Sequence, residues 1–95
     1  LDQRENRRLI RDCSNGRSVL NVFSYTGGFS VAAGVGGATH VTSVDTAAPA
    51  LAVGDRHWTL NGLDPAGHRS VTADAFEFLD EAAAEKRVWD IVIVD

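Results

Sequence analysis

The segment Asn21-Val-Phe-Ser-Tyr-Thr-Gly-Gly-Phe29, followed by Val41-Thr-Ser-Val-Asp45, decides the fold of this chain. The first segment begins as an apolar strand and runs into two glycines, which favour a tight turn into a helix. The second segment is another apolar strand, and it ends on a carboxylate. A strand, a turn, a helix and a second strand form a βαβ unit, whose two strands lie parallel in one sheet.

Strands and helices alternate along the rest of the chain. Residues 17–23 are almost continuously apolar, which is typical of a strand in a parallel sheet that helices cover on both faces. We therefore predict an α/β fold with right-handed crossovers between the strands. The expected helices cover residues 2–13, 29–35, 47–60 and 76–86, and the expected strands cover residues 17–23, 40–45, 69–73 and 89–94.

Local patterns add detail to three of these helices. Thr46 is a suitable N-cap for the third helix, in which Ala50, Val53, His57 and Leu60 keep a spacing typical of an inward face. Cys13 falls on the apolar stripe of the first helix with no histidine beside it, so we expect a buried structural cysteine and no nucleophile.

Composition excludes several classes of protein. No apolar run approaches the roughly 20 residues that cross a bilayer, so no membrane association is expected. The formal charge of −4 argues against a general nucleic-acid surface, although four of the nine basic residues lie among the first eleven positions. These arginines form either a solvated helix face with internal ion pairs or a phosphate-contacting surface. The single cysteine favours a reducing, cytoplasmic location, and the histidines lack metal-ligand spacing, so no metal is expected.

The last expected strand, residues 89–94, is apolar and belongs inside a sheet. An open edge there would be prone to pair with other chains. We therefore expect the chain to be part of a longer protein. The alternative is a small domain that covers this edge by forming a homodimer.

The glycine turn indicates the kind of ligand. It lacks the Gly-x-Gly-x-x-Gly pattern of dinucleotide sites and the Gly-Lys-Ser/Thr ending of phosphate loops. The pair Gly27-Gly28 therefore suits a ligand that carries adenosine and no phosphate. The alternative is a helix-entry turn that binds nothing.

Three acids follow successive strands, and the carboxyl ends of parallel strands share one edge of a sheet, where ligands bind. Asp45 has the spacing of a ribose-binding acid, or serves only the helix that follows it. Asp74 can accept a hydrogen bond from an adenine amine, or can act as a simple N-cap. Asp95 ends the fourth strand and is otherwise a solvated acid.

At these residues the chain resembles the class I S-adenosylmethionine (SAM)-dependent methyltransferases, and within them the family of large-subunit ribosomal RNA cytosine 5-methyltransferases. The resemblance spans essentially the whole chain. It implies a Rossmann-like parallel sheet with strand order 3-2-1-4, truncated after strand four, with residues 1–95 as the SAM-binding part of a methyltransferase domain. The segments that carry it are residues 1–7, 19–31, 41–45, 74–76 and 89–95.

The resemblance also implies roles for particular residues. Asp45 would hold the ribose, and Asp95, as the first residue of an Asp-Pro-Pro motif, would lie beside the target base. Arg4 would pair with the cofactor carboxylate, for which a bidentate geometry is strong. The methionine and ribose part would contact Phe23, Ser24, Tyr25, Thr26 and Gly27. The adenine would contact Asp74, Ala75 and Phe76.

The implied reaction is transfer of a methyl group from SAM to carbon 5 of a cytosine, after a thiolate has added at carbon 6. The family's nucleophilic cysteine lies downstream of this chain and Cys13 does not match it, so this chain alone is expected to be inactive. Contacts with ribosomal RNA are left to regions outside it. Two alternatives are a methyltransferase of the same fold that acts on a protein or small molecule, and a non-enzymatic α/β nucleotide-binding module or dehydrogenase half.

Overall fold

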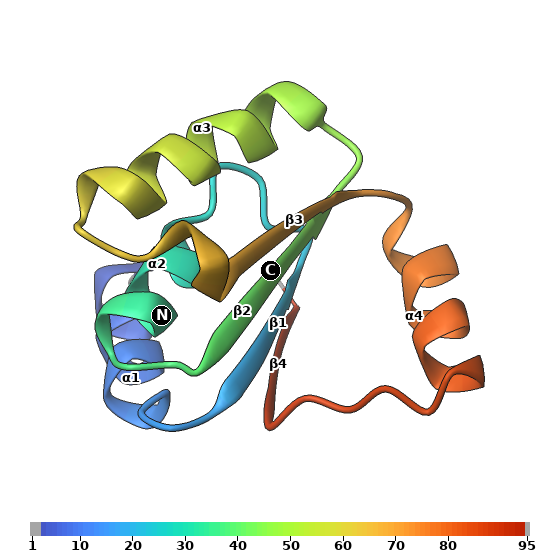
Figure 1. Cartoon of the computed structure of the whole chain (residues 1–95), viewed down its shortest axis with the longest axis horizontal. Helices are drawn as coiled ribbons and strands as arrows, with labels where there is room; N and C mark the ends of the chain where they lie inside the picture. Colours follow the sequence, from blue (N-terminus) through green and yellow to red (C-terminus); the bar gives the residue numbers. More distant parts are fainter. Residues whose placement is uncertain (1–2, 95) are drawn as a thin grey trace.

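The computed structural model describes residues 3–94 and confirms the α/β fold (Figure 1). Helices and strands alternate after a first helix, as the sequence predicts. The helices are α1 (Gln3–Cys13), α2 (Gly28–Val35), α3 (Ala48–Leu60) and α4 (Ala75–Ala84), with a short 3-10 turn at Pro65–Gly67. The strands are β1 (Ser18–Val22), β2 (His40–Asp45), β3 (His68–Thr72) and β4 (Ile91–Val94).

All neighbouring strands are parallel, in the order β3-β2-β1-β4. This order confirms the arrangement expected from the resemblance. Because β1 lies between β2 and β4, its carboxyl end and the turn that follows it lie at the centre of the sheet edge. Successive strands add to one side of β1 as far as β3 and then, with β4, to its other side, and open α/β sheets bind ligands at the point where the strand order switches in this way.

Two apolar clusters fix the layers. On one face, Leu20, Val22 and Val44 of the sheet pack against Phe78 and Ala82 of α4. On the other face, Val19 and Val41 pack against residues of α2 and α3, with Ile10 of α1 at the margin. Figure 1 shows the same division, with α1, α2 and α3 on one side of the sheet and α4 on the other.

Three local expectations were wrong. Cys13 is exposed, because α1 lies at the edge of its layer and buries none of its residues. The N-cap of α3 is Ala47 in place of Thr46, because the Asp45 carboxylate already accepts a hydrogen bond from the Ala47 N–H. Of the four residues expected on the inward face of α3, Ala50 is buried, and the other buried residues of this helix are Leu51, Gly54 and Trp58.

Glycine explains the orientation of α3. A Cβ atom on Gly54 would lie 3.1 Å from the Thr26 carbonyl oxygen and 3.7 Å from the Gly27 Cα. A side chain at residue 54 would therefore push the helix away from the turn. The helix turns its glycine towards the loop that follows β1, so α3 directly supports that loop.

No helix within residues 3–94 has the length and apolar character needed to cross a membrane.

Candidate functional site

The turn between β1 and α2 holds an unusual backbone. Phe23 and Tyr25 have φ angles of 57° and 50°, and Gly27 follows with 81°. The left-handed region suits glycine, but other residues occupy it at a cost of order 1–3 kcal/mol each when the surrounding structure holds them there. Such residues gather at ligand sites. Phe23 and Tyr25, two non-glycine residues with a left-handed backbone, lie within three positions of each other and mark this turn as a candidate site.

Hydrogen bonds hold the turn in this shape. The Ser24 N–H donates to the Val44 carbonyl at 3.1 Å, and the Gly27 N–H donates to the Ser24 carbonyl at 2.9 Å. The Tyr25 N–H donates to Oδ2 of Asp45, also at 2.9 Å. The turn is thus tied to the end of β2 at two points, one of which is the acid that the sequence predicts to bind ribose.

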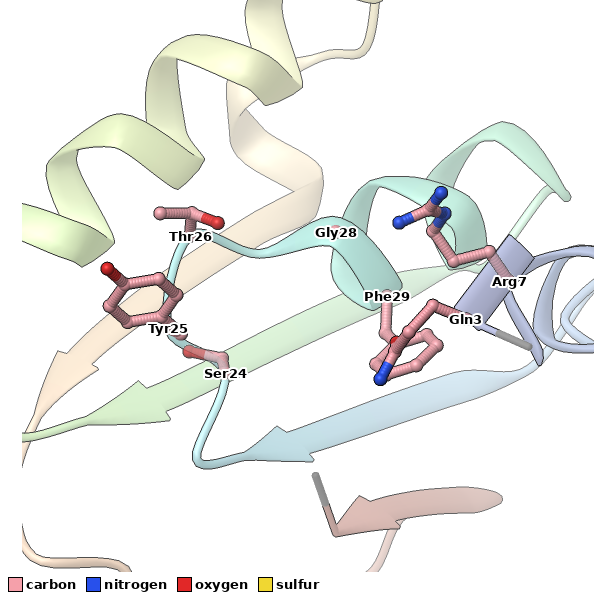
Figure 2. Close-up of a pocket in the computed structure, with 7 residues that line it drawn as sticks. All are labelled: Gln3, Arg7, Ser24, Tyr25, Thr26, Gly28 and Phe29. Atoms are coloured by element: carbon pink, nitrogen blue, oxygen red, sulfur yellow. The ribbon is translucent and has the colours of Figure 1, made fainter. Parts of the chain in front are cut away.

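A cavity of about 140 Å³ opens beside this turn. Figure 2 shows Gln3 and Arg7 projecting from α1 beside Phe29 and Gly28, with the loop residues on the other side. Ligand sites commonly enclose about 300–1,000 Å³, so this cavity suits an amino-acid-sized portion of a nucleoside ligand. The lining residues are Gln3, Arg7, Ser24, Tyr25, Thr26, Gly28 and Phe29.

One polar group in this cavity wall lacks a partner. Ser24 is 3% exposed, and its hydroxyl makes no hydrogen bond to any residue that the structure describes. A buried hydroxyl without a partner costs about 1–3 kcal/mol, and such groups in native proteins call for an explanation. A bound ligand with a polar atom at this point would supply the missing hydrogen bond.

The carboxylate of Asp45 lies at the carboxyl end of β2. Its Oδ1 accepts from the Ala47 N–H at 2.9 Å, and its Oδ2 accepts from the Tyr25 N–H at the same distance. Each carboxylate oxygen has further acceptor capacity. These bonds fix the side chain in one orientation, so a ligand with two neighbouring hydroxyls meets an acceptor that is already ordered.

The third expected contact region lies at the end of β3. Asp74 caps α4, with Oδ1 accepting from the N–H groups of Phe76 and Glu77 at 2.9 and 3.1 Å. The N-cap alternative is therefore present, and Oδ2 makes no bond to a residue within 3–94. The Phe76 ring is 70% exposed and meets Phe23 edge to face at 6.1 Å. Two exposed rings beside an acceptor suit a flat heteroaromatic group. Ala75 is buried in the apolar cluster that also contains Val22 and Val44.

The predicted residues do not all meet in one place. Ser24, Tyr25 and Thr26 line the cavity together with Arg7, while Arg4 lines a neighbouring groove. The sequence pattern did not single out Arg7, which lies about one helical turn from Arg4 and lines both the cavity and the groove. The predicted catalytic Asp95 lies outside the described residues.

A buried chain of polar side chains supports the turn from below. Nδ2 of Asn21 donates to Oγ of Ser30 at 3.0 Å, and the hydroxyls of Ser30 and Ser43 are 2.6 Å apart. Ser43 lies 2.7 Å from Nε2 of His68, whose Nδ1 is 3.2 Å from Oδ1 of Asp55. This series of hydrogen-bonded side chains thereby joins β1, α2, β2, β3 and α3. The sequence shows one polar residue within each of two apolar strands, Asn21 in β1 and Ser43 in β2. Only the strand register shows that these two residues are paired.

The charge state of His68 sets the direction of this chain. Burial lowers the pKa of His68 below its usual value, against the opposing effect of the Asp55 carboxylate. The neutral ring donates from Nδ1 to Asp55 and accepts at Nε2 from Ser43. Ser43 can then accept from Ser30, which accepts from Asn21, so every hydroxyl donates in the same direction.

These features define a class of protein. A parallel sheet, a strained glycine turn without a phosphate-binding pattern and an ordered acid at the next strand end are the parts of a nucleoside-cofactor site in a doubly wound fold. The unpartnered Ser24 hydroxyl and the Asp45 carboxylate fit a cofactor that presents an amino-acid end and a ribose. Residues 1–95 match the model of the SAM-dependent methyltransferase family, and the chain belongs to that family.

Individual relatives agree with this assignment. A ribosomal RNA large subunit methyltransferase of Deinococcus radiodurans is 48% identical over the whole chain, which covers 23% of that protein. The SAM-dependent methyltransferase of Agrobacterium tumefaciens superposes with a TM-score of 0.90 at 29% identity, over 98% of this chain and 31% of its own. A protein classed as a methyltransferase and solved in complex with S-adenosylhomocysteine (SAH) has a TM-score of 0.90 at 42% identity, and the match covers 97% of this chain and 24% of that protein's chain. The chain thus spans about a quarter of the length of such relatives.

Proposed function

We propose that the protein carrying this chain methylates large-subunit ribosomal RNA, with SAM as methyl donor and carbon 5 of a cytosine as acceptor. The family and the relatives named for ribosomal RNA support the general activity. The choice of cytosine rests on the resemblance in residues 19–31 and 89–95. A ribosomal RNA substrate also favours a cytoplasmic location.

One observation carries the proposal, namely the bond between the Asp45 carboxylate and the Tyr25 N–H beside an unpartnered Ser24 hydroxyl. SAM supplies an electrophilic methyl group on its sulfonium. Asp45 accepts from the ribose hydroxyls, and the edge formed by Asp74 and Phe76 receives the adenine. The loop residues Phe23, Thr26 and Gly27 border the ribose and methionine part.

The carboxylate of the cofactor requires a cation near the glycine turn. The resemblance assigns this role to Arg4, but Arg7 lines the cavity next to Ser24 and Gly28. We therefore propose Arg7 as the residue that pairs with the carboxylate, since its guanidinium can donate two parallel hydrogen bonds. Asp95 keeps its proposed role beside the target base.

The nucleophile that activates the base comes from elsewhere in the protein. Cys13 lies at the opposite end of α1 from Gln3, and a rise of 1.5 Å per residue separates them by about 15 Å along the axis. A thiol at that distance from the rim of the cavity cannot add to a base bound there.

Calorimetry on the full-length protein tests the proposal. We expect SAM to bind, and Asp45→Ala to weaken binding by about tenfold or more, because hydrogen bonds to a charged group contribute about 1.5–3 kcal/mol. Asp80→Ala removes an exposed acid from α4 and serves as the matched control. Mass spectrometry of ribosomal RNA after incubation with SAM should detect 5-methylcytosine. Absence of SAM binding by the unaltered protein would refute the proposal.

A further inference from the structure

The surface next to the cavity is a groove between α1 and α2 with a volume of about 380 Å³. One wall consists of arginines spaced three or four residues apart along α1, which places them on one face of the helix. The other wall consists of apolar residues of α2, and Asn61 also lines the groove. The lining residues are Arg4, Arg7, Arg8, Arg11, Gly28, Val31, Ala32, Val35 and Asn61.

The arginine wall presents exposed positive charge to this groove. All four arginines are exposed, and Arg11 forms an ion pair with Asp12 at 3.7 Å. The two side chains are 48% and 64% exposed, and exposed pairs of this kind contribute little. A chain with a formal charge of −4 concentrates four positive charges in one groove.

The groove leads into the candidate cofactor site. Arg7 and Gly28 line both the groove and the cavity beside Ser24. A polyanion in the groove would consequently pass close to the cavity beside Ser24. This continuity distinguishes the groove from a solvated face located elsewhere on the molecule.

The dimensions of the groove suit a nucleic-acid strand. Arg4 and Arg11 are seven residues apart, which a helix converts to about 10 Å, or roughly three nucleotides at about 3.4 Å per stacked nucleotide. Guanidinium groups bind phosphate oxygens in a bidentate geometry. The α2 wall offers Val31, Ala32 and Val35, which carry no acid that would repel the backbone.

We propose that the groove between α1 and α2 binds the phosphate backbone of the substrate RNA next to the nucleotide that is methylated. The inference rests on the proposed function, because it takes RNA as the substrate. It revises the expectation that RNA contacts lie wholly outside this chain. Arg8 and Arg11 contact only the backbone, whereas Arg7 faces both RNA and cofactor.

The test compares two charge-reversal variants of the full-length protein. Arg8→Glu with Arg11→Glu alters the groove and leaves the cavity residues intact. Arg69→Glu with Lys86→Glu changes the net charge by the same amount at two exposed positions, on β3 and after α4. Fluorescence anisotropy then measures binding of a ribosomal RNA fragment over a range of salt concentrations, while calorimetry measures SAM affinity.

For two lost phosphate contacts on a single strand, the slope of log affinity against log salt should become shallower by about 1.4. The loss of affinity relative to the unaltered protein should therefore be about 25 times larger at 0.1 M salt than at 1 M salt. The control pair should change both quantities far less, and SAM affinity should stay the same. Arg8→Gln with Arg11→Gln provides a milder second variant, for which a smaller loss in the same direction is expected. An unaltered slope, an equal loss in the control pair, or no RNA binding by the unaltered protein would overturn the inference.

The proposed function can fail separately. If the unaltered protein binds RNA through the groove but transfers no methyl group from SAM, the function is refuted while the groove assignment stands. If it methylates RNA and the groove variant keeps its salt slope, the function stands and the groove assignment is refuted.

Discussion

The buried polar chain under the glycine turn predicts a large effect for a small substitution, Ser43→Ala. The Ser43 hydroxyl is 2% exposed and bridges Ser30 on one side and His68 on the other. Its removal deletes one oxygen atom, takes away the acceptor for the Ser30 hydroxyl and leaves Nε2 of His68 unpaired, while Ser30 still accepts from Asn21. Each unmatched group costs about 1–3 kcal/mol, so we expect a loss of about 2–6 kcal/mol.

Hydrogen exchange on the full-length protein measures this loss where it occurs. Amides of β2 and of the first turn of α2 open together if the chain ties these elements to each other. A loss of 2 kcal/mol corresponds to exchange roughly 30 times faster, since about 1.4 kcal/mol is tenfold. The loop that forms the cofactor site should lose protection along with them.

Ser70→Ala is the matched control for this substitution. Ser70 donates to the same Asp55 carboxylate at 2.6 Å, but at an exposed position of the network. Water can replace its bond, so the loss should remain below about 1 kcal/mol. If Ser43→Ala changes protection no more than Ser70→Ala does, the buried chain is not what holds the turn in place.

Three further outcomes are expected. Because the pKa of His68 is lowered in the folded state, its contribution to stability should be complete above about pH 6.5 and should diminish as the pH falls through the folded-state pKa. Titration of His68 by NMR measures this pKa. A value at or above the ordinary one would contradict the prediction. Gly54→Ala gains about 1 kcal/mol of helix propensity, but the new Cβ lies 3.1 Å from the Thr26 carbonyl oxygen and pushes against the turn. We therefore expect calorimetry to show weaker SAM binding. Unchanged affinity would show that the turn tolerates displacement. Leu20→Ala in the fully buried centre of β1 should lower stability by about 2–5 kcal/mol in thermal unfolding, and a loss under 1 kcal/mol would contradict the assigned core.

Gly27→Val tests the glycine turn. A branched side chain at this position would enter the expected ligand space, which alone would reduce cofactor affinity more than stability. In the structure, Gly27 has a φ of 81°, and its Cβ would meet the Gly54 Cα at 3.4 Å. Valine at this position strains the backbone, and its branched side chain crowds Gly54 of α3, so stability and affinity should fall together.

The alternation of apolar strands with helices was readable from the sequence, because burial on both faces leaves a continuous apolar pattern in β1 and β2. The strand-end positions of Asp45 and Asp74 followed from the same pattern, since parallel strands end at one edge. The inward face of α3 did not follow, because Gly54 faces the turn for reasons of space that only the packed structure shows. Exposure of Cys13 was missed for a similar reason, as an apolar stripe does not reveal whether anything covers it.

The polar residues posed a different difficulty. Asn21, Ser30, Ser43, His68 and Asp55 are spread over 48 positions of sequence, and their distances depend on strand register and on crossover helices. No local spacing connects them. The same holds for the arginines of α1, whose spacing predicts a common face but not the wall of α2 opposite them.

A structure of the full-length protein with S-adenosylhomocysteine bound would test the central claim most directly. We predict that the ribose hydroxyls lie within hydrogen-bond distance of the Asp45 carboxylate and that the amino-acid end occupies the cavity beside Ser24 and Arg7. A ligand located away from the carboxyl ends of β1 and β2 would contradict the account.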